Sequence, residues 1–402
     1  MKILEVNSKQ IENEFLNLPR KLYKNDPNHV IPFDTDIKAA FDPNQNVHFR
    51  NGDAIRWILL NDAGKTIGRI AGFYEEEKAS ADYVKSGGCG FFECINSKEA
   101  AGMLFEKAAD WLKNKGFEAM TGPINFGEND SNWGCLVHGF EPQGYGMAYN
   151  PPYYQELFEN YGFELYYRQY SFHIDVEKPF PERFWKIAEW INQRPNYNFR
   201  HFSYKQTNKF VKDTVKVYNE AWPLLKDDFT PLDPNAVYEM LTRAKPILDP
   251  ELCWFAYYKD EPIAFFLFLP DANQILRKLN GKLHLINKLK FLKLKNSHTM
   301  NRMRGVAAGV SPKFQNSGIE SGIIYQLKKV VDKNPQYKQV ELSWVGDFNP
   351  KMLSLYKATG AYHAKTHITY RYMINKDIPF KRFMPEKVDE TALPDYAALI
   401  NY

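Results

Sequence analysis

The chain has 402 residues, of which 44% are hydrophobic and 25% are charged, as in an ordinary folded protein. Its 8 Trp, 25 Tyr and 29 Phe exclude a chain that is disordered throughout. The net charge of +4 is too small for binding by charge alone, so we expect no nucleic-acid partner. At roughly 150 residues per domain, the length favours two domains.

The four cysteines, Cys89, Cys94, Cys135 and Cys253, form no CxxC pair, and no Cys/His set has zinc spacing. We therefore expect no metal, and thiols that are buried as small apolar groups. The first residues contain no apolar stretch of signal-peptide length. The longest apolar run, 263–269, is far shorter than the roughly 20 residues that span a bilayer. These features predict a cytoplasmic protein.

Two β-hairpins are predicted, each from two apolar runs that are joined by turn residues. They are expected at 54–60 with 66–73 and at 253–258 with 263–269. Each hairpin is followed by a helix with an apolar face and by a short strand. These are expected at 97–115 and 118–121 in the first half, and at 318–332 and 339–345 in the second. The two halves therefore have the same order of elements.

A short phrase repeats at a constant distance. Leu157-Phe158-x-x-x-Gly162 reappears as Leu355-Tyr356-x-x-x-Gly360, and each glycine or leucine stands 198 residues after its counterpart. Together with the matching order of elements, this indicates a duplicated domain of the α/β class. We expect domains at 1–178 and 179–376 and a tail at 377–402. The segment 182–250 is expected to be mostly helical, and the tail either wraps back on the surface or is loosely ordered.

One loop has the properties of an anion site. A predicted strand ending at Val310 runs through Ser311-Pro312 into a helix that opens near Gly318. Main-chain N–H groups at a helix start have no partner inside the helix, and a glycine allows close approach of a phosphate. The segment therefore suits a diphosphate, although an ordinary strand–loop–helix joint has the same pattern.

A second motif follows at a fixed distance. The chain reads Val310-x-Pro312 and Gln315-x-x-Gly318, and then Asn349-x-x-Met352-x-x-Leu355-Tyr356-x-x-x-Gly360-Ala361. Over residues 250–375 this order resembles the GCN5-related N-acetyltransferase (GNAT) superfamily. The whole chain resembles tandem-domain bacterial proteins of that group whose substrate is unknown.

The resemblance implies a fold of two tandem GNAT domains, each a mixed, mostly antiparallel sheet flanked by helices. It implies acetyl-CoA or another acyl-CoA as cofactor, with Tyr356 as proton donor to the departing thiolate. Asn349 would seat the cofactor or shape the splayed strands. Main-chain groups would hold the diphosphate and the pantetheine arm with its acyl carbonyl. The diphosphate residues are Gln315, Asn316, Ser317, Gly318, Ile319, Glu320 and Ser321, and the pantetheine residues are Ala308, Gly309 and Val310.

The sequence departs from the family pattern at several positions. Glu320 stands where the family has Gly or Ala, so its carboxylate would repel a diphosphate unless it points away. In the first half, Glu99-x-x-Gly102 takes the loop position and Phe158 replaces the tyrosine, which implies a non-catalytic copy. Its other distinctive phrases form either a rigid pocket wall or a structured surface loop. They are 90–94, 122–125 and 149–154.

The predicted activity is acyl-CoA-dependent N-acyl transfer, foremost N-acetyl transfer, to a small-molecule amine by direct attack. Glu341 and Asp347 are candidates for the general base, or else solvated surface charges. One alternative is a non-catalytic acyl-CoA-binding or regulatory protein. Another is an aminoacyl or long-chain acyl transferase that uses tRNA or acyl carrier protein. We expect a monomer or a dimer.

The segment 277–295 carries seven Lys or Arg and no Asp or Glu. Its apolar residues fit two helical stripes. One is Leu276, Leu279, Leu283 and Ile286, and the other is Leu285, Leu289 and Leu292. Such a helix suits an anionic membrane surface or an acyl-carrier partner. The alternative is a solvated arm whose stripe packs on the rest of the protein.

Overall fold

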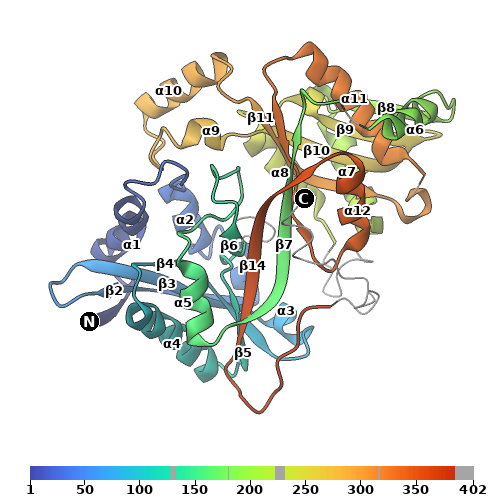
Figure 1. Ribbon diagram of the computed structural model, residues 1–402. Coiled ribbons are helices and arrows are strands. Elements are labelled where there is room, and N and C mark those ends of the chain that lie inside the picture. Colours follow the sequence, from blue (N-terminus) through green and yellow to red (C-terminus); the bar gives the residue numbers. More distant parts are fainter. Residues whose placement is uncertain (128–132, 180, 222–230, 316, 385–402) are drawn as a thin grey trace. The chain divides into compact units, whose positions relative to one another are not determined.

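The computed structural model describes residues 1–127, 133–179, 181–221, 231–315 and 317–384 (Figure 1). These residues form two compact units. Unit 1 consists of Met1–Tyr170, Ile275–Lys293 and Lys365–Met384, and unit 2 of Ser171–Gln274 and Leu294–Ala364.

The sheet of unit 1 follows the order β1-β2-β3-β4-β5-β14, and β6 also pairs with β14. All its pairings are antiparallel except that of β4 with β5. Its strands are β1 (Lys2–Glu5), β2 (Gly52–Leu60), β3 (Thr66–Glu75), β4 (Ser86–Cys94), β5 (Ala119–Gly122), β6 (Cys135–His138) and β14 (Tyr362–Met373) from residue 365. Its helices are α1 (Lys9–Leu22), α2 (Asp34–Ala40), η1 (Val47–Arg50), α3 (Glu76–Ser80), α4 (Lys98–Asn114) and α5 (Tyr154–Tyr161).

The sheet of unit 2 follows the order β7-β12-β11-β10-β9-β8, and only β11 with β12 is parallel. Its strands are β7 (Glu164–Asp175) from residue 171, β8 (Tyr197–His201), β9 (Cys253–Tyr258), β10 (Glu261–Pro270), β11 (Arg302–Val310), β12 (Gln339–Glu341) and β13 (Val345–Gly346). Its helices are α6 (Glu182–Asn192), η2 (Tyr204–Gln206), α7 (Thr207–Ala221), α8 (Pro234–Ala244), η4 (Pro250–Leu252), η5 (Pro312–Phe314), α11 (Ile319–Lys333) and α12 (Pro350–Ala358). The chain between β10 and β11 holds α9 (Asn273–Leu276) and α10 (Leu285–Asn296).

Both predicted hairpins are present, as β2 with β3 and β9 with β10. In the second, Lys259 and Asp260 both have positive φ, 49° and 65°, as a tight two-residue hairpin turn requires. For that reason β10 begins at Glu261, two residues earlier than expected. The aromatic residues fill the cores, among them Phe105 and Phe158 in unit 1 and Phe255 in unit 2. The four cysteines are buried free thiols, as expected.

The 198-residue repeat corresponds to the same structure in both halves. The helices α5 and α12 are each followed by a glycine in the left-handed region, Gly162 with φ 101° and Gly360 with φ 77°. A residue with a side chain is strained there, so the repeated glycine ends the helix. Each glycine precedes a strand of 12 residues, β7 or β14. This confirms the duplication.

The two long strands exchange halves between the units. β7 begins in unit 1, and its residues 173–175 pair with β12 of unit 2. β14 begins in unit 2, and its residues 370–373 pair with β5 of unit 1. The compact units are therefore discontinuous in sequence, and a domain boundary at residue 178 stays a prediction.

Three other expectations need correction or completion. The strand expected at 339–345 ends at Glu341, where its parallel pairing with β11 stops, although the Leu342 amide still donates to the main-chain oxygen of Phe172 on β7, 2.9 Å away. The segment 182–250 is mostly helical in its described part, but it also contains the edge strand β8.

The described part of the tail lies on unit 1, where the Phe383 amide donates to the Tyr166 main-chain oxygen at 3.0 Å. Residues 385–402 lie outside the described part.

The prediction of one long helix across 276–295 is wrong, because the structure has two helices there, α9 and α10. The chain turns between α9 and α10 at Asn280 and Gly281, whose φ values are 51° and 66°. The Arg20 guanidinium binds the main-chain oxygen of Asn280 at 3.2 Å and thereby holds this turn on unit 1. Within the described residues, no helix combines the length and apolar character needed to cross a membrane.

Candidate active site

The site of interest begins where two parallel strands of unit 2 separate. β11 pairs with β12 only over Arg302–Arg304, opposite Gln339–Glu341. Beyond that point β11 continues to Val310 with β10 as its partner, while the chain after β12 turns away. Among the described residues, no strand pairs with the freed edge of β11. Main-chain groups on this edge can therefore bind a ligand.

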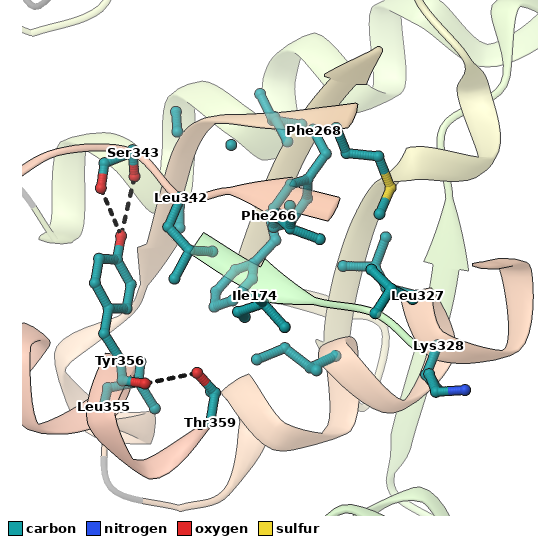
Figure 2. A pocket seen from close by; sticks show the side chains of 18 of the residues that line it. Ile174, Phe266, Phe268, Leu327, Lys328, Leu342, Ser343, Leu355, Tyr356 and Thr359 are labelled. Atoms are coloured by element: carbon teal, nitrogen blue, oxygen red, sulfur yellow. Dashed lines mark hydrogen bonds between the residues drawn. The ribbon is translucent and has the colours of Figure 1, made fainter. Parts of the chain in front are cut away.

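A mostly apolar cavity of about 80 Å³ lies at this separation (Figure 2). Its wall combines β10 and β11 with α11, α12 and the end of β7. The side chains that form it include Ile174, Phe266, Phe268, Ala307, Ala308, Leu327, Leu342, Ser343, Leu355, Tyr356 and Thr359. The structure thus brings Ala308 and Tyr356, two predicted site residues, into one cavity.

Several lining residues were not identified from the sequence. Phe266 and Phe268 stand on the second predicted hairpin, where alternation of side chains along a strand would have placed them on one face. Ile174 comes from the first half of the sequence, because β7 ends in unit 2. No local pattern signals that exchange.

Tyr356 is one of four polar residues in the cavity wall, with Lys328, Ser343 and Thr359. Its hydroxyl donates to the main-chain oxygen of Ser343 at 3.1 Å and is also 3.1 Å from the Ser343 hydroxyl (Figure 2). Burial raises the pKa of Tyr356 above its usual value, although Ser343 and the Arg304 charge act in the opposite direction. The phenol therefore keeps its proton at neutral pH and can donate it.

Asn349 acts at the start of the helix that carries Tyr356. Its side-chain oxygen accepts a hydrogen bond from the Met352 amide at 3.2 Å, which makes it the N-cap of α12. This contact orients α12 toward the cavity. The predicted part of Asn349 in seating a cofactor stays a prediction.

The predicted diphosphate loop joins β11 to α11. Gln315 donates to the Val310 oxygen at 3.3 Å and Ser317 to the Phe314 oxygen at 2.5 Å, so both side chains brace the loop. Gly318 has φ 85° and precedes the first turn of α11. Gly309 and Val310 continue β11 from the cavity toward this loop. Asn316 lies outside the described residues.

The first turn of α11 fits a diphosphate. The first intrahelical bond runs from the Gly322 amide to the Gly318 oxygen at 3.0 Å, so the amides of Ile319, Glu320 and Ser321 precede the ladder. A Cβ atom on Gly318 would lie 2.7 Å from Ile187. Burial raises the pKa of Glu320, the residue that departs from the family pattern here.

The other two site residues of this turn face the protein. Ile319 is fully buried and Ser321 is 7% exposed. Their side chains therefore support the helix, and only their main chain is available to a ligand.

The two candidate bases are neither in the cavity nor on the surface. Val340 and Leu342 line the cavity, so strand alternation places Glu341 on the opposite face. There Glu341 is fully buried, with an ion pair to Arg302 at 3.5 Å. Asp347 is buried, with an exposed fraction of 4%. The expectation of solvated surface charges is wrong for both.

The corresponding place in unit 1 is closed. The segment after β5 packs against β4: the Ile124 amide donates to the Cys89 oxygen at 2.8 Å, and the Asn125 side chain accepts from the Phe91 amide at 2.7 Å. Phe158, which replaces the tyrosine, is fully buried in the core. In the described part of unit 1, the segment after β5 thus occupies the position beside β4, and a phenylalanine takes the place of the tyrosine.

The helix start of unit 1 also differs. The Ser97 hydroxyl caps α4 by accepting from the Ala100 amide at 3.2 Å. A capped helix start offers fewer free N–H groups to an anion than an uncapped one. This agrees with the predicted non-catalytic role of the first half.

Two distinctive phrases of the first half meet in a buried network. Tyr154 and Tyr23 donate to the same carboxylate oxygen of Glu93, at 2.7 and 2.8 Å. Tyr153 donates to the Cys94 oxygen at 2.8 Å. Burial raises the pKa of Glu93. These residues are an interior polar cluster and not a surface loop.

The chain is similar in sequence to two bacterial proteins along most of its length. No family model matches the chain. It is 24% identical over 380 residues to a Caulobacter vibrioides protein named bacterial ceramide synthase, covering 92% of this chain and 97% of that protein. It is 22% identical over 370 residues to the Escherichia coli protein YghO, covering 90% and 92% respectively.

Two solved structures share the fold. A tandem GNAT protein from the clavulanic acid biosynthesis pathway has a TM-score of 0.54 at 9% identity, over 94% of this chain and 99% of that one. A GCN5-related glucosamine N-acetyltransferase region of a fungal multi-domain GH3 β-N-acetylglucosaminidase has a TM-score of 0.53 at 11% identity, over 92% and 38%. The chain therefore has the tandem GNAT fold, as its sequence predicts.

Proposed function

We propose that unit 2 transfers a long-chain acyl group from acyl-CoA to an amine, and that the amine is itself lipid-like. The observation that carries the proposal is the Tyr356 hydroxyl in the wall of an apolar cavity, beside the freed edge of β11. The name of the Caulobacter relative supports the substrate class, because a ceramide is the amide of a long-chain base and a fatty acid.

Acyl-CoA supplies an activated acyl group as a thioester. The first-turn amides of α11 and the left-handed Gly318 are suited to its diphosphate. The freed edge of β11 at Ala308 would align the pantetheine arm and polarise the acyl carbonyl. The cavity, of about 80 Å³, would contact the part of the acyl chain next to the carbonyl.

The chemical step is direct attack. The amine lone pair forms a C–N bond to the carbonyl carbon, and the C–S bond breaks. Tyr356 gives its hydroxyl proton to the departing sulfur, and the proton lost by the attacking nitrogen restores the phenol through solvent. Placement of both reactants beside the hydroxyl supplies most of the rate enhancement.

An apolar wall favours a long chain over an acetyl group. Within Figure 2 the polar side chains are Ser343, Tyr356, Thr359 and Lys328, and the remaining labelled side chains are aliphatic or aromatic. Each buried methylene of an acyl chain contributes about 0.8 kcal/mol in such surroundings. Acetyl-CoA would gain little from this wall, so we expect it to be the poorer donor.

The test combines two donors with two acceptors. Palmitoyl-CoA or acetyl-CoA is incubated with the full chain and with either sphinganine or a short soluble alkylamine. Released thiol is followed by absorbance and the amide by mass spectrometry. We expect amide from palmitoyl-CoA and sphinganine, and its loss in Tyr356→Phe. Acyl-CoA binding without amide from any pair would instead support a non-catalytic binding protein.

A further inference from the structure

The helix α10 is apolar on two opposite faces. Phe291 and Leu294 are half-buried beside Asn287, whose side chain is 8% exposed. On the other side Leu285, Leu289 and Leu292 follow the i, i+4, i+7 spacing of one helical face. A surface helix of a globular protein needs only one apolar face, so the second requires another explanation.

That second face points into solvent. Leu285 and Ile286 are each 72% exposed, Leu289 is 60% exposed and Leu292 is 54% exposed. Leu283, just before the helix, is 41% exposed. Contiguous apolar side chains in water are a liability for a soluble protein unless a partner covers them. We call Leu285, Ile286, Leu289 and Leu292 the outer stripe.

The helix is fixed with the outer stripe outward. The buried Asn287 side chain donates to the main-chain oxygens of Leu279 at 2.9 Å and Lys282 at 2.7 Å. Lys290 donates to the Lys278 oxygen at 2.8 Å. These bonds hold the inner face of α10 against the preceding turn. They therefore fix which side chains of the helix point outward.

Lysines border the outer stripe. At about 100° per residue, Lys288 and Lys295 lie along one edge of the stripe and Lys290 along the other, while Lys293 lies within the stripe, between Leu289 and Ile286. Within the described part of the chain, none of the four is within ion-pair distance of a carboxylate. The whole segment 277–295 contains no acid.

We propose that α10 is a docking surface for an anionic lipid bilayer, with the outer stripe inserted among the acyl chains and the lysines at the phosphates. A 12-residue helix that is apolar outward and bordered by cations is suited to lie in the membrane interface. The apolar side chains stand on a single convex helix. A fluid bilayer can adapt to that shape, whereas a protein would need a matching groove.

The experiment is cosedimentation of the full chain with vesicles at low salt. One set contains phosphatidylcholine alone and the other phosphatidylcholine with phosphatidylglycerol. We expect binding to the anionic set only, and weakening as salt is added. The variant Leu285→Ser/Leu289→Ser/Leu292→Ser should lose it. Met240→Ser, a change at another exposed apolar residue on α8, should retain it.

A charge variant tests the lysines. Lys288→Gln/Lys293→Gln changes two whose side chains, unlike those of Lys290 and Lys295, donate to no main-chain oxygen in the described residues. Binding should weaken about 30-fold, because each lysine near an anionic surface contributes roughly fivefold. Lys107→Gln/Lys113→Gln removes the same charge from exposed positions on α4 and should have little effect. Melting curves confirm that each variant is folded.

Three results would overturn the proposal. One is no vesicle binding by the wild type at low salt. Another is equal loss of binding in the α10 and α4 charge variants. The third is binding of an acidic acyl carrier protein, abolished by the α10 variants, without binding to vesicles. None of these outcomes depends on whether the protein has acyltransferase activity.

Discussion

Tyr356 and Ser343 are in contact at two points: the phenol oxygen is 3.1 Å from the main-chain oxygen of Ser343 and 3.1 Å from its hydroxyl. Ser343 stands two residues after the end of β12, where β11 and β12 separate, and Tyr356 stands on the next helix, α12. The proton donor is therefore fixed at the point where the cavity opens.

The change Tyr356→Phe should lower kcat about 100-fold, the smaller end of the range for a general acid, and leave the Kd for acyl-CoA unchanged. The phenol acts only when the thiolate leaves, so its loss belongs to the chemical step. Steady-state kinetics and calorimetry measure the two quantities. Tyr325→Phe, the same change at a tyrosine of α11, should have no effect. If kcat of Tyr356→Phe were unchanged, water and not the phenol would supply the proton to the leaving thiolate.

The pH dependence follows from the burial of the same phenol. Because burial raises its pKa above the usual value near 10, Tyr356 stays protonated, and thus competent as an acid, up to about pH 10. The kcat at saturating substrates should therefore not fall between about pH 7 and pH 9.5. The expectation would be contradicted if kcat of the wild type fell with a midpoint near pH 8 and kcat of Tyr356→Phe did not. Such a result would mean that the phenol loses its proton near pH 8.

The change Gly318→Ala should weaken acyl-CoA binding about tenfold. Alanine is disfavoured at φ 85°, and its Cβ would lie 2.7 Å from Ile187, so the loop must shift. Gly102→Ala is the matched control, since a Cβ there meets nothing within 4 Å. Calorimetry with acyl-CoA compares the two.

A control separates a moved loop from a lost fold. Gly318→Ala should still be folded at the temperature of the titration, and its melting curve beside that of the wild type measures this. If wild type, Gly318→Ala and Gly102→Ala bound acyl-CoA with equal affinity, this loop would not be the diphosphate site.

Filling the cavity should change donor preference. Leu327→Phe adds three carbon atoms to the wall, and we expect kcat/KM for palmitoyl-CoA to fall at least tenfold. The value for acetyl-CoA should change far less, because an acetyl group does not reach along the wall. Val306→Leu, at a residue of β11 that is 42% exposed, is the control. A uniform loss with both donors would argue against the cavity as the acyl site.

Local patterns predicted the hairpins and the helices because both depend on neighbours in sequence. Gly162 and Gly360 were identifiable for the same reason, since a helix end needs a left-handed residue. The residues 339–345 gave no sign of the strand end after Glu341, because it coincides with the end of pairing to β11, a strand separated from it in the chain by the helix α11.

The site was only partly predictable for a related reason. Tyr356 and Ala308 carry a motif, but Phe266 and Ile174 reach the cavity through pairing between distant strands. For α10, periodicity predicted the stripe of Leu285 and its partners but not the side to which it points. The buried Asn287 decides that, through bonds to the preceding turn.

The buried charges behind the cavity predict a strong effect on stability. Glu341 is fully buried between Arg302, 3.5 Å away, and His173, 3.4 Å away. Glu341→Ala leaves the guanidinium of Arg302 with Asp271 as its remaining recorded carboxylate partner, at 2.5 Å. We expect the free energy of unfolding to fall by about 3 kcal/mol, at the lower end for loss of one member of a buried pair, since Asp271 still compensates part of the Arg302 charge.

Urea titration of the full chain, followed by tryptophan fluorescence, measures that change. The matched control is Glu182→Ala, which removes the carboxylate of the exposed pair with Lys186 on α6 of the same unit. Because water already solvates both members of that pair, its loss should not shift the unfolding midpoint measurably. The isosteric Glu341→Gln keeps the volume but removes the charge, so it should lie close to Glu341→Ala if charge is the cause. If Glu341→Gln were instead as stable as the wild type, packing and not the ion pair would explain why Glu341 is buried.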